Sequence, residues 1–521
     1  MKNDKWPTAL AVLSGLLLTL SFPPMKAPWL AWIALIPLLK SISGKPGREA
    51  FTLGLVAGLA HYLSLMYWIV VVLGHYGGLP LPASIGVLAL FCLYLALYPA
   101  LFALLARGLQ GSRLQILGSA ALWTSTELLR AKALTGFPWS LLAHSQFSQL
   151  PLIQVSDLFG TYAISFLLVS SNVLLYLLLF DFRSFSGPFR KAEAAAVVGL
   201  LSATLVYGMV RLEQFDSRDE LQKTARIAVV QGNIDQSVKW NPQYQERTLE
   251  IYETLTRRAA DFNPDLVLWP ETAVPFFFQE ENTLSKRVAD VSRQPGRTLI
   301  FGSPAYGVSK EVTQFYNRAY ILWDGKVHGY YDKIHLVPFG EYVPLKSLLF
   351  FVNRLVPAAG DFASGNVLNP LRGPGFSSGI LICFEVIFPE LARGQVQRGA
   401  DILINLTNDA WFGRTSAPYQ HLSMAAFRAV ENRRPLVRAA NTGISGFIRP
   451  TGEITGRIDL FRRDLLTAEV AFGSPQMSLY TRHGDIFALF LFAFSVVQII
   501  LNVWYRKQNS ATKTRRHKAR R

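Results

Sequence analysis

The chain has 521 residues, 50% of them hydrophobic and 12% aromatic, and a formal net charge of +17 at pH 7. A chain this long and this apolar is not typical of a single soluble globular domain, and it indicates membrane-spanning segments. The basic excess would suggest nucleic acid as a partner, but the loops between the apolar segments account for much of it, so no nucleic acid is predicted.

Eight apolar stretches predict about eight transmembrane helices. They cover residues 8–22, 28–39, 51–73, 81–105, 114–129, 162–180, 194–210 and 486–504, and the first, second and fifth are marginal. The first follows Lys2 and Lys5 as a signal peptide would, but Ser21-Phe22-Pro23-Pro24 offers no small-x-small cleavage site, so we expect an uncleaved helix. The prediction is a polytopic α-helical membrane bundle, with about seven helices in residues 1–212 and a closing helix over 484–505.

The positions of lysine and arginine predict the orientation of this bundle. With the N-terminus in the cytoplasm, the cytoplasmic side holds Lys40, Lys45, Arg48, Arg107, Arg113, Arg183, Arg190, Lys191 and the basic tail over 506–521. The opposite loops hold essentially Lys26, Arg130 and Lys132. This asymmetry follows the positive-inside rule. It predicts a multi-pass protein of a bacterial inner membrane with both termini cytoplasmic and residues 222–476 in the periplasm.

Between the seventh and eighth apolar stretches the pattern changes to short β-branched runs that alternate with polar helical stretches. The predicted strands are 225–230, 266–269, 298–302, 316–322, 329–331, 380–383 and 402–406, and the predicted helices are 243–261, 282–293 and 423–432. The dipeptide Asp324-Gly325 predicts a hairpin turn. Strands and helices that interleave in this way indicate a layered α/β sandwich.

Three polar residues stand where predicted strands or their turns give way to loops: Glu271, Lys333 and Cys383. Cys383 is the only thiol of this region, and Cys92 lies in an apolar stretch, so a disulfide is not expected. A thiol nucleophile, a carboxylate that takes its proton and a lysine that stabilises an oxyanion form a complete set for acyl transfer. Taken singly, a lone cysteine is more often a small buried hydrophobe, and a lone Glu or Lys is more often solvated surface charge.

At these residues the chain resembles the nitrilase (carbon-nitrogen hydrolase) superfamily and, more closely, the bacterial apolipoprotein N-acyltransferase family. The motifs are Trp-Pro-Glu-Thr at 269–272, Lys-Ile-His-Leu-Val-Pro-Phe-Gly-Glu-Tyr-Val-Pro at 333–344 and Asn-Leu-Thr-Asn-Asp-Ala-Trp-Phe-Gly at 405–413. The resemblance covers nearly the whole chain. It implies an exported nitrilase-like αββα sandwich, with no metal and no other cofactor.

The resemblance also implies roles for individual residues. Glu271 is the general base, Cys383 the nucleophile and Lys333 the group that stabilises the oxyanion. Supporting residues are Glu341, which orients Lys333 or relays protons, and Glu385 and Trp240, which shape the site. Phe384 stands where the family often has tyrosine, so an aromatic packing role survives there but a phenol hydroxyl does not.

The implied reaction has two steps. The Cys383 thiolate takes an acyl chain from a membrane phospholipid as a thioester, and the N-terminal amine of a diacylglyceryl-cysteine apolipoprotein then accepts it as an amide, the last step of lipoprotein maturation, with ping-pong kinetics. The segment 345–356 is too apolar for a free surface loop, and we expect a substrate arm there that guards the site. Its named residues are Phe350, Phe351, Leu355 and Val356.

Two other function classes stay open at this point. A membrane-tethered amidase or nitrilase acting on a small soluble amide would use the same three residues. A transporter with a non-catalytic exported domain would need polar groups within its membrane helices, and Glu127 and Arg130, three residues apart, are the main ones. These two would most simply neutralise each other, although a lipid head group is the alternative partner.

Overall fold

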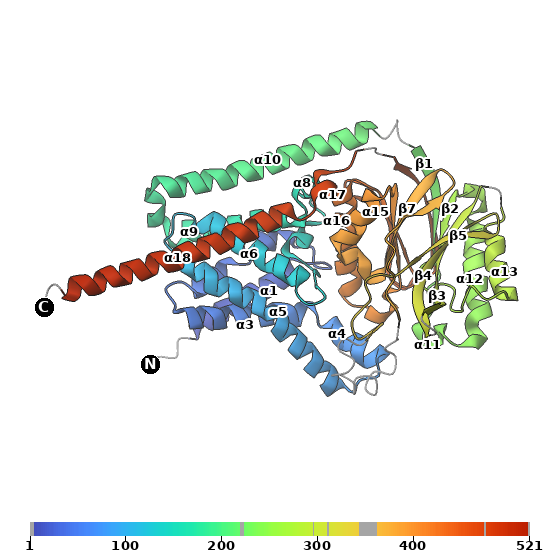
Figure 1. Cartoon of the computed structure of the whole chain (residues 1–521), viewed down its shortest axis with the longest axis horizontal. Helices are drawn as coiled ribbons and strands as arrows, with labels where there is room; N and C mark the ends of the chain where they lie inside the picture. Colours follow the sequence, from blue (N-terminus) through green and yellow to red (C-terminus); the bar gives the residue numbers. More distant parts are fainter. Residues whose placement is uncertain are drawn as a thin grey trace.

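The computed structural model describes residues 5–218, 223–294, 296–309, 312–342, 362–473 and 476–518. It consists of a helical bundle and a layered α/β domain packed side by side (Figure 1). The predicted substrate arm, with Phe350, Phe351, Leu355 and Val356, lies outside the described residues.

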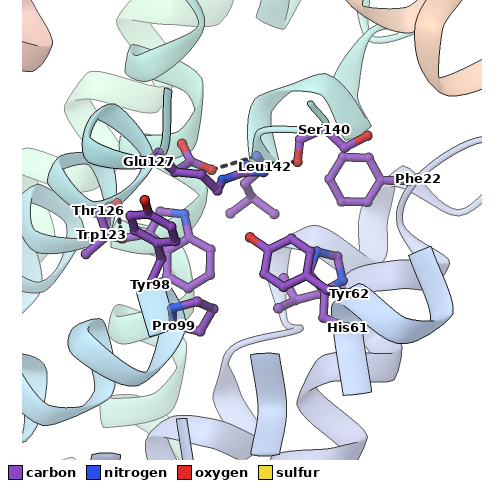
Figure 2. Close-up of a pocket in the computed structure, with 12 residues that line it drawn as sticks. Phe22, His61, Tyr62, Tyr98, Pro99, Trp123, Thr126, Glu127, Ser140 and Leu142 are labelled. Atoms are coloured by element: carbon purple, nitrogen blue, oxygen red, sulfur yellow. Dashed lines mark hydrogen bonds between the residues drawn. The ribbon is translucent and has the colours of Figure 1, made fainter. Parts of the chain in front are cut away.

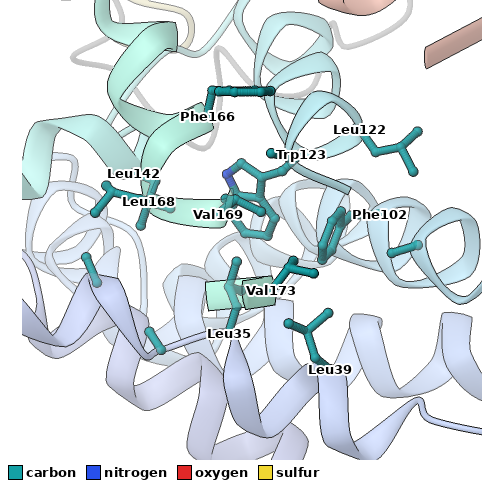
Figure 3. Close-up of a cluster of buried hydrophobic side chains, with 14 of the residues drawn as sticks. Leu35, Leu39, Phe102, Leu122, Trp123, Leu142, Phe166, Leu168, Val169 and Val173 are labelled. Atoms are coloured by element: carbon teal, nitrogen blue, oxygen red, sulfur yellow. The ribbon is translucent and has the colours of Figure 1, made fainter. Parts of the chain in front are cut away.

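The bundle is built from long helices with short helical segments between them. The long helices are α1 (Trp6–Leu20), α3 (Gly47–Leu65), α5 (Leu81–Leu109), α6 (Gln115–Lys132), α9 (Thr161–Phe180), α10 (Pro188–Arg218) and α18 (Ile486–Lys518). The short segments are η1 (Pro28–Trp32), α2 (Ile36–Ser41), α4 (Trp68–Val71), η2 (Val72–Tyr76), η3 (Leu142–Gln146), α7 (Leu150–Ile153), α8 (Ser156–Phe159) and η4 (Phe182–Ser186). Figure 3 shows the apolar core of the bundle, where side chains of α2, α5, α6 and α9 meet, among them Leu39, Phe102, Trp123 and Val169.

Each predicted span coincides with a helical segment, but the predicted count of about eight transmembrane helices is not confirmed. Within the described residues, four helices are long and apolar enough to cross a membrane, or five if the bent pair Gly47–Leu65 and Trp68–Tyr76 is one span. The four are Leu81–Leu109, Thr161–Phe180, Pro188–Phe215 and Ile486–Trp504. The marginal stretches account for the difference: α1 has only 15 residues, the second stretch is split between η1 and α2, and α6 carries Glu127, Arg130 and Lys132.

Glu127 and Arg130 line a cavity inside the bundle. Figure 2 shows Glu127 among the residues around this cavity. Each has a backbone partner of its own. Glu127 Oε1 accepts a hydrogen bond from the Leu142 N–H at 2.7 Å, and Arg130 Nη1 donates to the Trp139 carbonyl at 2.8 Å. Among the ion pairs of the described residues, none joins the Glu127 and Arg130 side chains directly. Their shortest contacts are instead with the backbone of the loop that follows α6.

The α/β domain contains two six-stranded sheets, ordered β12-β1-β2-β3-β4-β5 and β11-β10-β9-β8-β7-β6. Every predicted strand is present, and the hairpin turn at Asp324-Gly325 joins β4 to β5 as expected. Sequence reasoning did not identify β6 or β9 to β12. The strands are β1 (Lys223–Gln231), β2 (Leu266–Leu268), β3 (Thr298–Ser309), β4 (Val312–Trp323), β5 (Lys326–Asp332), β6 (Leu371–Gly373), β7 (Phe376–Ile382), β8 (Ile402–Thr407), β9 (Leu436–Ala440), β10 (Ser445–Ile448), β11 (Ile454–Ile458) and β12 (Asp464–Phe472).

The two sheets face each other across an apolar core that includes Ile227, Leu268, Ile382 and Ile404. Helices α12 (Gln245–Arg258) and α13 (Thr283–Val291) cover the outer face of the first sheet, and α15 (Pro389–Gln397) and α16 (Ala417–Asn432) cover the second (Figure 1). The predicted αββα sandwich is therefore present. The remaining helical segments are α11 (Gln236–Lys239), η6 (Pro242–Tyr244), η7 (Ala260–Phe262), η8 (Cys383–Ile387), η9 (Asp409–Phe412) and α17 (Leu479–His483).

Helix α16 lies between the second sheet and the bundle, and it forms the junction of the two parts (Figure 1). The buried Gln420 on this helix accepts hydrogen bonds from the indole N–H groups of Trp139 at 2.8 Å and Trp68 at 3.3 Å. At the end of the same helix, Arg433 forms an ion pair with Asp157 of the bundle at 2.6 Å. The α/β domain is thus fixed to the bundle by polar contacts as well as by apolar packing.

Candidate active site

Glu271 lies just beyond the end of β2, and both of its carboxylate oxygens are held. Oε1 accepts a hydrogen bond from Asn317 Nδ2 on β4 at 2.7 Å, and Oε2 accepts one from the Asn408 N–H, just after β8, at 2.8 Å. The next residue, Thr272, has a left-handed backbone with φ 46°. Gly302 lies against this corner, because a Cβ there would come within 2.4 Å of the Thr272 nitrogen. The carboxylate therefore has one defined position.

Lys333 follows β5, and its side chain is only 1% exposed. Its Nζ lies 2.9 Å from the Glu341 carboxylate and 3.6 Å from Glu271 Oε1. Asn317 Nδ2 also donates to Glu341 Oε1 at 2.9 Å, so it bridges the two carboxylates. Burial alone lowers the pKa of Lys333, but the charges of Glu341 and Glu271 outweigh it and hold that pKa above its usual value. The lysine is therefore a fixed positive charge.

Cys383 comes directly after β7 and is the first residue of η8. Its backbone is left-handed, with φ 52°, a conformation that costs energy for a residue other than glycine and that recurs at functional sites. The half-buried thiol has a pKa raised to about 12, first by burial and then by the negative charge of Glu271, while Lys333 acts in the opposite direction. The structure thus brings Glu271, Lys333 and Cys383 into one electrostatically coupled site in which the resting thiol is protonated.

Glu385 connects the turn around Cys383, called here the cysteine turn, to the loop around Lys333. Its Oε2 accepts the Ile382 N–H at 2.7 Å. Its Oε1 accepts the N–H groups of Ile334 at 2.7 Å and His335 at 3.1 Å, and the Tyr331 hydroxyl at 2.9 Å. Burial raises the pKa of Glu385 to about 7, and the backbone donors and Lys333 limit the rise. Glu385 therefore holds the residues on either side of Lys333 against the residues on either side of Cys383.

A buried polar cluster that sequence reasoning missed supports the cysteine from behind. Arg438 on β9 forms an ion pair with Asp409 at 2.6 Å. Its Nη2 also lies 3.0 Å from His421 Nδ1, and His421 Nε2 lies 3.2 Å from the Cys383 carbonyl oxygen. Burial and then Arg438 lower the pKa of His421, while Asp409, whose Oδ1 lies 3.2 Å from His421 Nδ1, acts in the opposite direction. The Cys383 carbonyl can only accept, so His421 Nε2 is the donor in that contact. Of this cluster only Asp409 lies in a motif that the sequence analysis named, at 405–413, and no spacing connected it to His421 or Arg438.

The two aromatic residues predicted to lie near the site have different surroundings. Phe384 packs against Phe137 and Trp139 of the bundle, with ring centroids 6.4 Å apart in both pairs, which fits the expected packing role. Trp240 is 46% exposed and lies next to the buried Lys239. Its role in shaping the site stays a prediction. Within the described residues, no three His, Cys, Asp or Glu side chains group as metal ligands.

Comparison with known proteins gives two family matches. Residues 14–174 match the apolipoprotein N-acyltransferase N-terminal domain, and residues 226–476 match the carbon-nitrogen hydrolase family. An apolipoprotein N-acyltransferase of Geobacter metallireducens is 47% identical over 484 residues, which is 92% of each chain. One of Methylococcus capsulatus is 33% identical over 466 residues, 88% of this chain and 89% of that one. Among solved structures, an amidase from Nesterenkonia sp. has a TM-score of 0.37 and 22% identity, covering 50% of this chain and 94% of that chain.

The raised pKa of Cys383 predicts how its alkylation depends on pH. In a Cys92→Ala protein, we expect iodoacetamide to modify the resting thiol about a hundredfold or more slowly near pH 7 than a free cysteine, because only the thiolate reacts. Since the thiol is mostly protonated, the rate should rise about tenfold per pH unit between about pH 6 and pH 8. Intact mass against time measures both, with the chain unfolded in denaturant as control. A folded protein that reacts as fast as the unfolded one would contradict this protonation state.

The four donors to Glu385 predict that its amide variant is damaging. In Glu385→Gln, an NH2 group must face at least one N–H or O–H donor, which leaves buried groups unpaired at a cost of about 1–3 kcal/mol. We expect a lower Tm and at least a tenfold loss of acyl transfer, although the thiol is still present. Glu469→Gln, at an exposed position on β12, is the matched control and should match the parent. Equal Tm and activity in both variants would show that Glu385 does not hold the two loops.

Proposed function

The chain belongs to the apolipoprotein N-acyltransferase family, and on this basis we propose that it moves a fatty acyl chain from a membrane phospholipid to the N-terminal amine of a diacylglyceryl-cysteine apolipoprotein, through a thioester on Cys383. The observation that carries the proposal is the buried ammonium of Lys333 between the carboxylates of Glu341 and Glu271, in the same site as a cysteine on a left-handed turn. This arrangement suits acyl transfer, in which negative charge develops on the carbonyl oxygen of the substrate.

In the first half-reaction, Glu271 takes the proton of the Cys383 thiol and the sulfur attacks the ester carbonyl carbon of the phospholipid. Lys333 donates to the oxyanion of the tetrahedral intermediate. The intermediate collapses, the carbon–oxygen bond to the glycerol breaks, and Glu271 returns its proton to the leaving oxygen. The products are a thioester on Cys383 and a lysophospholipid.

In the second half-reaction, the N-terminal amine of the apolipoprotein attacks the thioester carbonyl carbon. Glu271 takes the proton that the nitrogen loses, and Lys333 again stabilises the oxyanion. The carbon–sulfur bond breaks, the proton passes to the sulfur, and an amide and a free thiol result. Two substrates that use one site in turn give ping-pong kinetics.

We place this reaction at the periplasmic face of a bacterial inner membrane, with residues 222–476 in the periplasm and both termini in the cytoplasm. The apolar helices and the position of Phe384 against Phe137 and Trp139 of the bundle support a site that is reached from the membrane. A small soluble amide would not need this arrangement, which argues against a membrane-tethered amidase.

The thioester is tested by intact mass. Purified protein given phospholipid alone should gain the mass of one fatty acyl chain, and addition of a diacylglyceryl lipopeptide should remove it faster than ammonia or water does. Cys383→Ala should gain nothing. Cys92→Ala, which removes the other cysteine, should be acylated like the parent. Acylation of Cys383→Ala at the parental rate would falsify the assignment of the nucleophile.

The role of Lys333 is tested by the rate of the same step. Lys333→Ala keeps the thiol and the base but removes the cation that faces the oxyanion, so thioester formation should slow by about a hundredfold to a thousandfold. Lys326→Ala, at an exposed position on the same strand β5, is the matched control and should be unchanged. If Lys333→Ala forms the thioester within about threefold of the parental rate, another group stabilises the oxyanion.

A further inference from the structure

The site contains a second buried lysine that the mechanism above does not use. Lys239 ends the short helix α11, and its side chain is 1% exposed. Its Nζ donates to the backbone carbonyl of Glu271 at 3.2 Å and to Thr272 Oγ1 at 2.5 Å. Among the ion pairs of the described residues, none includes Lys239, whereas Lys333 pairs with two carboxylates.

An ammonium group that is buried with only neutral acceptors is incompletely compensated. Burial lowers the pKa of Lys239 to about 8, and the titratable groups that face it, Glu271 and Cys383, act in the opposite direction. A new negative charge in the site therefore stabilises the ammonium form of Lys239. Loss of the Cys383 proton to solvent creates such a charge. In the proposed reaction the proton passes to Glu271, so the negative charge moves from that carboxylate to the sulfur, and Lys239 faces both groups.

Lys239 also contacts the strained backbone turn at Glu271 and Thr272, called here the Glu271 corner, next to the carboxylate of the proposed general base. Thr272 is left-handed and Gly302 lies against it, so the backbone there depends on its surroundings to keep its conformation. Lys239 holds this corner at two consecutive residues, through the Glu271 carbonyl and the Thr272 hydroxyl. The carboxylate of Glu271 leaves the chain at this same corner.

We propose that Lys239 is a positioning residue of the active site, which fixes the Glu271 corner and supplies a positive charge that favours ionisation of Cys383. The inference rests on the proposed function of Cys383 as the nucleophile. Lys239 acts through these two residues and needs no contact with substrate.

The test compares Lys239→Met and Lys239→Arg in the full-length Cys92→Ala protein, with Lys286→Met, at an exposed position on α13, as the control. The measurement is the rate of Cys383 alkylation by iodoacetamide as a function of pH. Near pH 7, Lys239→Met should react about tenfold more slowly than the parent, because the thiolate has lost a nearby cation. Lys239→Arg keeps the charge and should react within about threefold of the parent. Lys286→Met should match it.

The pH profile separates the effect of the charge of residue 239 from the effect of the size of its side chain. In the parent, the rise in rate should flatten over about one pH unit above about pH 8, because Lys239 loses its own proton there and thiolate formation becomes about tenfold less favourable. Neither variant has a group that titrates at this position, so both rates should keep rising. A parental profile that does not flatten, or a Lys239→Met rate equal to the parental rate near pH 7, overturns the proposal.

The experiment has separate controls for the folding of the variants and for the proposed function. The Tm of each variant shows whether it is folded. If Lys239→Met does not fold, the pH profile of Lys239→Arg is compared with that of the parent. A profile that flattens in the parent but not in Lys239→Arg supports the proposal, and profiles of the same shape overturn it. Alkylation needs neither phospholipid nor lipopeptide. A parent that shows the predicted profile but forms no acyl-enzyme therefore contradicts the proposed function and leaves the role of Lys239 in thiol ionisation intact.

Discussion

The buried ammonium of Lys333, held between Glu341 and Glu271, is the interaction on which the site depends. Removing three charged groups from water is costly, and only their mutual pairing makes their burial tolerable. With Lys239 included, two ammonium groups and the carboxylates of Glu341 and Glu271 lie together in the site, and Glu385 lies next to them. A proton that moves from Cys383 to Glu271 stays within this set, so the net charge of the buried region does not change when the nucleophile forms. The site can thus create a thiolate without importing a charge.

The geometry of this charge set follows from the packing of the two sheets. Glu271 and Lys333 follow strands of the first sheet, and Cys383 follows a strand of the second. The apolar core between the sheets therefore sets the distance between Glu271, the proposed base, and Cys383, the proposed nucleophile. Glu385 then fixes the finer position, because its four donors come from both sides of the gap. A change in that core would alter the reaction geometry without touching any charged residue.

The layered sandwich and the three residues Glu271, Lys333 and Cys383 could be predicted from the sequence. A polar residue at the end of an apolar strand is a local signal that can be recognised without knowledge of the fold. Sequence reasoning could not identify Lys239, Asn317 or Arg438, whose surroundings are created by segments far away in the chain. Arg438 alternates with apolar residues on the short strand β9, and its buried guanidinium is paired with Asp409 and bonded to Asn405 and the Ile444 carbonyl. The helix count could not be predicted for a related reason. Helix α6 is too polar for a lipid-exposed span, but its polar side chains other than Lys132, Glu127 and Arg130 among them, are buried inside the bundle.

The junction between the bundle and the α/β domain contacts the proposed active site. Gln420 accepts hydrogen bonds from Trp139 and Trp68, and separation of the two parts would leave these buried polar groups to find new partners. The same Trp139 stacks on His421, which donates to the Cys383 carbonyl, and it packs against Phe384, the residue after the nucleophile. One tryptophan of the bundle thus contacts both supports of the cysteine turn. A sandwich detached from its bundle would keep the charged residues but lose the packing around Cys383, so we infer that the bundle contributes to the geometry of the proposed site and is more than an anchor.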